Sequence, residues 1–138
     1  MIKKLYVSNY ALIDRLEMEP SPGMTILTGE TGAGKSIILG ALGLATGARA
    51  DLAALRDNTR KCVVELSVEI DGMGLEGFFA ENDLDYEPLT ILRREILPSG
   101  KSRAFVNDTP VLLDTLGRLA AHLLDVHSQH QRLLLSRP

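Results

Sequence analysis

The stretch MTILTGETGAGKSIILGALGLATG, residues 24–47, decides the fold. Residues 24–28 form a short apolar run rich in β-branched side chains, which predicts a strand buried on both faces. From Lys35 to Gly47 apolar side chains recur at helical spacing, and Gly47 stands where a glycine cap ends a helix. Between them, GETGAGKS (29–36) matches GxxxxGK[ST] completely. Strand, glycine loop and helix in this order predict an α/β fold of the P-loop NTPase type.

Each residue type in the loop has a physical role. Glycines let backbone N–H groups converge on an anion, and the helix N-terminus adds partial positive charge. Lys35 supplies a mobile, catalytic cation for the β and γ phosphate oxygens, and the Ser36 hydroxyl is a ligand for Mg²⁺. A structural turn would explain the glycines but not Lys35 and Ser36. The predicted nucleotide-binding residues are Gly29, Glu30, Thr31, Gly32, Ala33, Gly34, Lys35, Ser36 and Ile37.

Composition excludes several classes of protein. The 138 residues are 45% hydrophobic, which suffices for the core of one domain. Fifteen Lys and Arg against 18 Asp and Glu give a net charge of −3, which excludes a globally basic nucleic-acid-binding protein but leaves a local basic patch open. The single cysteine, Cys62, excludes an internal disulfide and indicates a reducing compartment. No secretory signal or apolar run of roughly 20 residues occurs, so we expect a cytoplasmic protein with no membrane partner.

The rest of the chain reads as two hairpins and further helices. Alternating polarity in residues 3–9 and 12–18 predicts a hairpin, and residues 62–70 predict a strand. Residues 74–81 predict a short helix. Residues 89–97 and 102–107 flank a turn sequence and predict a second hairpin. We expect Arg93, Arg94 and Arg103 on this hairpin to form a solvated or DNA-facing edge.

A helix is expected to start at Pro110, capped by Asp108 or Thr109. Its apolar face would comprise Leu112, Leu113, Leu116, Leu119 and Ala120. From His122 the chain is expected to begin as an apolar strand and to end as the start of another helix.

The residues that hydrolysis would require are incomplete. Gln129 follows the last apolar segment and is a candidate contact for the γ-phosphate, although the residues by themselves favour an ordinary solvated side chain for a lone Gln. His127 and His130 have no Cys or carboxylate at zinc spacing, so we interpret them as hydrogen-bonded structural histidines. Asp114 and Asp125 each end an apolar run, but neither is followed by Glu, and no LSGGQ-type sequence occurs. The catalytic carboxylates of a cassette ATPase are therefore not found in this sequence.

Three segments carry a resemblance to a known family: VSNYALIDRLEMEPSPGMTILTGETGAGKSIILGALGLATGARAD (7–51), RREILPSGKSRAFVNDTPV (93–111) and LLDVHSQHQRLLL (123–135). They resemble the start of the RecN family of bacterial DNA repair proteins, relatives of the SMC proteins. The resemblance implies an ATPase head assembled from both ends of a longer chain joined by an antiparallel coiled coil. Residues 1–138 would be its N-terminal lobe, a mixed sheet with antiparallel hairpins and a P-loop helix. The coiled coil and the C-terminal lobe, which brings the signature sequence, the Walker B Asp and the catalytic Glu, would be absent.

The resemblance also implies residue roles and partners. Gln129 matches the Q-loop glutamine, a catalytic contact for Mg²⁺ and the attacking water. Arg56 matches an arginine directed toward nucleotide or DNA, with a solvated surface arginine as the alternative. Tyr10 lies at an aromatic position near the adenine side, with a core or turn aromatic as the alternative. The implied cofactors are ATP and Mg²⁺. The implied partners are the C-terminal lobe, a second head and DNA.

In this interpretation ATP binding joins two heads and hydrolysis releases them, in double-strand break repair and recombination on the nucleoid. The lobe alone is expected to be inactive as an ATPase. Two alternatives stay open. A small P-loop phosphotransferase would need an Arg-rich lid and an acceptor site within these residues. A nucleotide-switched, non-enzymatic DNA clamp would need strong DNA binding, against which the net charge of −3 argues.

Overall fold

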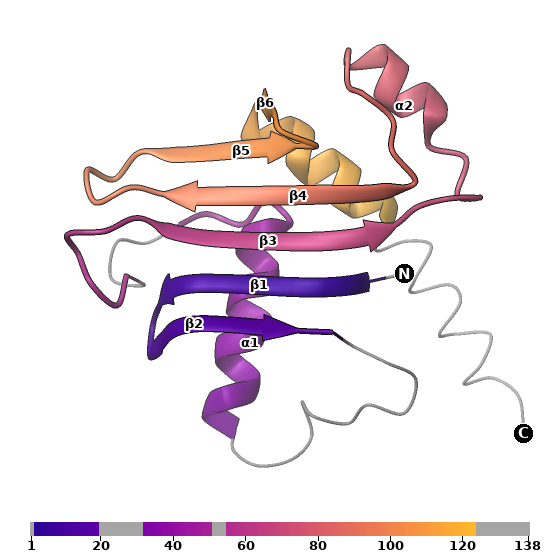
Figure 1. Ribbon diagram of the computed structural model, residues 1–138. Helices are drawn as coiled ribbons and strands as arrows, with labels where there is room; N and C mark the ends of the chain where they lie inside the picture. The colour runs from indigo at the N-terminus through magenta and orange to yellow at the C-terminus, as the bar shows by residue number, and fades with distance from the viewer. Residues whose placement is uncertain (1, 20–31, 51–54, 124–138) are drawn as a thin grey trace, which may run out of the picture.

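The computed structural model describes residues 2–19, 32–50 and 55–123. Its centre is a six-stranded sheet in the order β2-β1-β3-β4-β5-β6 (Figure 1). The strands are β1 (Ile2–Tyr10), β2 (Ile13–Met18), β3 (Cys62–Glu69), β4 (Leu89–Ile96), β5 (Ser102–Val106) and β6 (Thr109–Val111). The helices are α1 (Gly32–Ala45), α2 (Glu76–Glu81) and a helix over 113–123.

Both predicted hairpins and the predicted strand 62–70 are confirmed. In the first hairpin Leu5 lies opposite Met18 and Tyr10 opposite Ile13. In the second, β4 and β5 pair from Leu92 with Val106 to Ile96 with Ser102. The two hairpins become one sheet because β3 pairs with β1 on one side and with β4 on the other.

The core lies on one face of this sheet. Both α1 and the helix over 113–123 cover that face (Figure 1). The strands contribute alternate residues to it, as expected for a sheet with one face buried. The core members from the strands include Leu5, Val7, Val64, Leu66, Leu92, Ile96 and Val106, and those from the two helices include Ala41, Leu44, Ala45, Leu116 and Leu119.

The predicted helix over 35–47 is confirmed as α1, which begins three residues earlier and ends at Ala45. Of the apolar residues at helical spacing, Ala45 is buried, and Ile38 and Leu42 pack against the core. Leu39, the fourth, is 53% exposed, whereas Ala41 is fully buried. Two residues along a helix correspond to about 200° of rotation, so a face centred on Ala41 turns Leu39 to the opposite side.

The expected helix start at Pro110 is wrong. Asn107 and Asp108 have φ values of 49° and 69° and form the two-residue turn between β5 and β6. Two successive residues with positive φ are the signature of a type I′ hairpin turn, which Asn and Asp tolerate better than most residues. Pro110 therefore lies in the edge strand β6, where its missing N–H costs little.

The helix itself begins at residue 113. Leu112, expected on its apolar face, precedes it and is 75% exposed. Leu116, Leu119 and Ala120 are buried as expected. His122 and Leu123 belong to this helix and not to a strand, because its apolar spacing continues from Leu119 to Leu123.

The predicted short helix over 74–81 is confirmed as α2. The ring of Phe79 makes edge contacts with Phe78 and Tyr86 and anchors α2 to the core. All pairs between the described strands are antiparallel. The strand expected at 24–28, which would make the sheet mixed, lies outside the described residues. Neither α1, α2 nor the helix over 113–123 is long and apolar enough to cross a membrane.

Candidate nucleotide-binding site

The second half of GETGAGKS opens α1, which begins at Gly32. The first N–H groups of a helix have no partner within it, and the helix dipole makes this end partly positive. The first turn of α1 carries no acidic side chain that would repel an anion. Of the predicted site residues, Gly32–Ile37 are thus contiguous in the helix. Gly29, Glu30, Thr31 and the side chains of Lys35 and Ser36 lie outside the described part of the chain.

The carboxyl end of α1 is capped by glycine, as predicted. Gly47 has a φ of 104°, and the Ala48 N–H donates to the Gly43 carbonyl at 2.8 Å. A left-handed residue directly after the last turn is the usual helix stop, and only glycine adopts it without strain.

Arg94 binds to this end of α1. The expectation that Arg94 lies on a solvated or DNA-facing edge is wrong. The Arg94 side chain is 1% exposed and lies on the core side of β4. Its Nη1 donates to the carbonyls of Leu44 and Ala48 at 3.1 and 2.7 Å. The sequence signal was the alternation of β4 itself, because residues 90, 92, 94 and 96 share one face with the core.

Arg93 and Arg103 do lie on the opposite, open face, where they pair with Glu95. Arg93 Nη2 is 2.6 Å from Glu95 Oε2, and Lys61 Nζ is 3.3 Å from the same oxygen. Arg103 Nη1 is 3.7 Å from Glu95 Oε1. Burial would raise the pKa of this carboxyl, but the hydrogen bonds and charges of Lys61 and Arg93 outweigh it and hold the pKa below its ordinary value.

Arg56 lies beside the turn between β1 and β2, on a loop that Asn9 holds in place. Leu55 forms an isolated bridge with Tyr10. The buried Asn9 Nδ2 donates to the carbonyls of Asp57 and Arg60, both at 2.9 Å, and Asn9 Oδ1 accepts from the Asp57 N–H at 2.7 Å. With a φ of 57°, Asn9 adopts a conformation that asparagine tolerates better than most residues. Sequence reasoning missed this residue.

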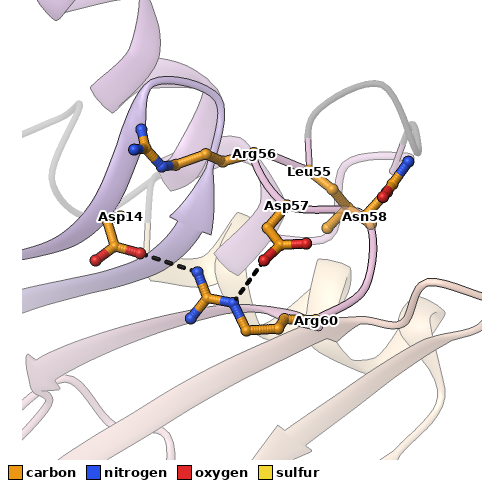
Figure 2. A pocket seen from close by; sticks show the side chains of 6 residues that line it. All are labelled: Asp14, Leu55, Arg56, Asp57, Asn58 and Arg60. Atoms are coloured by element: carbon orange, nitrogen blue, oxygen red, sulfur yellow. Dashed lines mark hydrogen bonds and ion pairs between the residues drawn. The ribbon is translucent and has the colours of Figure 1, made fainter.

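The Arg56 loop borders an open pocket of about 720 Å³ (Figure 2). Figure 2 shows Arg60 between two carboxylates, with Nη2 2.9 Å from Asp14 Oδ1 and Nε 3.1 Å from Asp57 Oδ2. Hydrogen bonds from Thr59, followed by that from Arg60, hold the pKa of Asp57 below its ordinary value. Arg56 instead donates from Nη1 to the Leu12 carbonyl at 3.2 Å. Within the described residues it has no carboxylate partner, so its charge is available to an anion in this pocket.

Tyr10 packs against α1, which matches the core or turn alternative. A Cβ on Gly40 would stand 2.3 Å from the Tyr10 hydroxyl oxygen, so the glycine makes room for the ring. Burial, with a smaller contribution from Cys62, raises the pKa of this phenol.

No group of three His, Cys, Asp or Glu side chains in the described ranges could hold a metal. Gln129, His127, His130 and Asp125 lie beyond those ranges. Asp114 is helical, as expected, and pairs with Arg118 at 3.0 Å.

Comparison with protein families assigns the class. A family model described as an AAA domain matches residues 4–83, more than half of the chain. The chain therefore belongs to the AAA domain family. A solved structure from a study of ATP-driven dimerization and DNA-stimulated activation of SMC ATPases superimposes with a TM-score of 0.70 and 17% identity, over 89% of this chain and 79% of that one. The expected fold, a P-loop ATPase lobe of the SMC type, is confirmed.

Curated relatives narrow the assignment within this class. DNA repair protein RecN of Vibrio cholerae is 41% identical over 139 residues, covering 100% of this chain and 25% of the relative. DNA repair protein RecN of Xylella fastidiosa strain Temecula1 is 40% identical over 141 residues, covering 99% of this chain and 25% of the relative. The chain thus spans about a quarter of these relatives' length. The resemblance to RecN is confirmed over essentially the whole of residues 1–138.

Proposed function

We propose that this chain is the ATP-binding, N-terminal lobe of a RecN-like ATPase that acts in DNA double-strand break repair and recombination. One observation carries the proposal. A complete GxxxxGK[ST] motif has its second half at the start of α1, in a chain that is similar to RecN from end to end. The similarity to RecN supports a role in DNA repair, and the motif supports the binding of ATP.

The phosphates of ATP would lie against the first turn of α1, with Lys35 near the β and γ oxygens. The first turn fits an anion because it has free N–H groups, no acidic side chain, and glycine at positions 32 and 34. Ser36 and Gln129 are the residues that would hold Mg²⁺. When bound, the ion would neutralise charge on the β and γ phosphates.

Arg56 is proposed as a second anion contact, directed toward nucleotide or DNA. Its hydrogen bond to the Leu12 carbonyl fixes the guanidinium beside the pocket, and the guanidinium has further donors for a phosphate. The neighbouring Arg60 is a poorer candidate, because Asp14 and Asp57 already occupy its donors.

The lobe is proposed to act together with parts that it does not contain. These 138 residues carry neither a signature sequence nor a Walker B Asp followed by Glu. We infer that a C-terminal lobe and a second head complete the site, that ATP joins the heads, and that hydrolysis releases them. The ATP-driven dimerization named for the structurally similar SMC ATPases supports the step in which ATP joins the heads. DNA would be the substrate of the whole protein, in the cytoplasm at the nucleoid.

The contacts of three arginines argue against the mobile lid that a phosphotransferase would require. Arg94 is buried against α1, and Arg93 and Arg103 are engaged by Glu95. These three arginines therefore do not form a free, mobile set that closes over a second substrate.

Titration of ATP into the purified chain with Mg²⁺ tests the proposal. We expect saturable binding that Lys35→Ala weakens by about tenfold or more, because a charge-assisted contact to the phosphates is lost. Lys101→Ala removes an exposed lysine in the turn after β4 and should leave the affinity unchanged. Equal affinity in the chain and in Lys35→Ala would refute the site. Sustained ATP hydrolysis by the chain alone would refute the split catalytic centre.

A further inference from the structure

The strongest unexplained feature is the buried guanidinium of Arg94 at the end of α1. Besides the bonds from Nη1 to Leu44 and Ala48, Arg94 Nε donates to the Ser102 hydroxyl at 2.6 Å. These partners come from two directions, because Leu44 and Ala48 lie at the end of α1 and Ser102 begins β5. The side chain therefore ties the helix to the turn end of the second hairpin.

A buried cation at this position is costly to maintain. Removing an arginine from water is unfavourable unless its donors are satisfied. Within the described residues the partners of Arg94 are a hydroxyl and two carbonyls and include no carboxylate, and burial lowers the pKa of its guanidinium. The carbonyl end of α1 offers compensation, because it carries partial negative charge and α1 has no basic residue in its own last turn. Arg94 supplies that cation from β4.

Fixing one end of a helix controls the position of the other. The 14 residues of α1 span about 20 Å, so a tilt of about 3° at the carboxyl end moves the amino end by about 1 Å. A misplacement of about 1 Å is enough to weaken a binding site strongly. The amino end of α1 is the part that carries GKS.

We propose that Arg94 is a positioning residue for the nucleotide site. By holding the carboxyl end of α1 on the sheet, it sets where the first turn presents its N–H groups to the phosphates. This inference rests on the proposed nucleotide binding, but its first experimental arm does not.

The first arm measures amide hydrogen exchange without nucleotide. Arg94→Met keeps the length of the side chain and removes its donors, and Arg94→Lys keeps the charge with a single donor group. Arg93→Met, on the open face of the same strand, is the control. We expect faster exchange over residues 38–45 of α1 in Arg94→Met, partial recovery in Arg94→Lys, and unchanged exchange in β3 for both. Equal acceleration in α1 and β3, or none in α1, would overturn the positioning role.

The second arm compares the affinities for ATP, inorganic tripolyphosphate and adenosine. Loss of folded protein lowers the affinity for every ligand by the same factor. A displaced α1 instead weakens ATP and tripolyphosphate by about tenfold and leaves adenosine unchanged. Arg94→Lys should recover part of the loss, and Arg93→Met should show none. An unchanged ratio of ATP to adenosine affinity in folded Arg94→Met would refute the proposal.

The two proposals fail in distinguishable ways. If the unsubstituted chain binds neither ATP nor tripolyphosphate, the nucleotide site is refuted while the exchange arm still decides whether Arg94 holds α1. If Arg94→Met does not fold, Ser102→Ala takes its place, because it removes only the Nε partner. We expect a smaller acceleration of exchange in α1 from it, and no change would count against the role of Arg94.

Discussion

The backbone of Gly47 approaches that of Gly117 so closely that a Cβ on residue 47 would stand 2.9 Å from the Gly117 Cα. This contact joins the end of α1 to the helix over 113–123. The close approach requires that residue 47 has no Cβ, whereas a Cβ on Gly117 would meet open space. Gly47 also has a φ of 104°, a conformation that residues with a Cβ rarely adopt.

We predict that Gly47→Ala destabilises the protein by about 3 kcal/mol or more, since it combines backbone strain with a backbone clash. Gly72→Ala is the matched control, because Gly72 has a φ of 80° and open space where its Cβ would stand. That variant should lose only the strain component, about 1–2 kcal/mol. Urea unfolding of both variants measures the difference. Equal losses would show that the contact with Gly117 contributes nothing.

Asn9 is the residue on which the Arg56 loop depends. We predict that Asn9→Asp costs about 3 kcal/mol or more, because the new carboxylate would face the Asp57 and Arg60 carbonyls where the amide donated. The loss should shrink as the pH falls from 7 to 4, since a protonated carboxyl donates one hydrogen bond again. Asn58→Asp, exposed in the same loop, should change stability by less than about 0.5 kcal/mol. A pH-independent loss would argue against this hydrogen-bonding account.

Much of the fold could be predicted because its strands alternate strongly. The hairpin of β1 and β2, the strand β3 and the pair β4–β5 follow from period-2 patterns. The sequence misplaces the start of the last helix because Asp108 and Thr109 are both good helix caps. Asp108 favours caps and type I′ turns alike, and the pairing of β5 with β6 decides between them.

The candidate site also has a part that the sequence predicts and a part that it does not. GxxxxGK[ST] is local in sequence, so its helix could be predicted, and Gly32–Ile37 lie within α1. Nucleotide binding by these residues stays a prediction. The contacts of Arg94 with Leu44 and Ala48 join residues about 50 positions apart, as do those of Asn9 with Asp57 and Arg60. No local pattern encodes such pairs. Arg94 in particular contradicts the rule that arginines on a hairpin are solvated, because helix carbonyls replace water.

The contact between Tyr10 and Gly40 predicts that the effect of Gly40→Ala on stability depends on the Tyr10 hydroxyl. Gly40→Ala should be neutral or destabilising in the unsubstituted protein, because the new Cβ meets the Tyr10 hydroxyl. In a Tyr10→Phe background the nearest remaining ring atom is 3.4 Å away, so the substitution should stabilise by up to about 1 kcal/mol through helix propensity. A double-mutant cycle on unfolding free energies measures the coupling. Additive effects would mean that Tyr10 moves aside without cost.

We predict that ionisation of Cys62 lowers the stability of the protein at alkaline pH. Burial raises the pKa of its thiol to about 11 from 9.0, only partly opposed by the charge of Arg94. Between these values the folded protein keeps a proton that the unfolded chain releases, so stability is full below pH 9 and falls as the pH rises toward 11. The slope attributable to Cys62 should approach about 1.4 kcal/mol per pH unit. Unfolding measured from pH 8 to 11 should show this slope in the unsubstituted protein and lose it in Cys62→Ala. An identical pH dependence in both proteins would show that the thiol already ionises freely in the folded state.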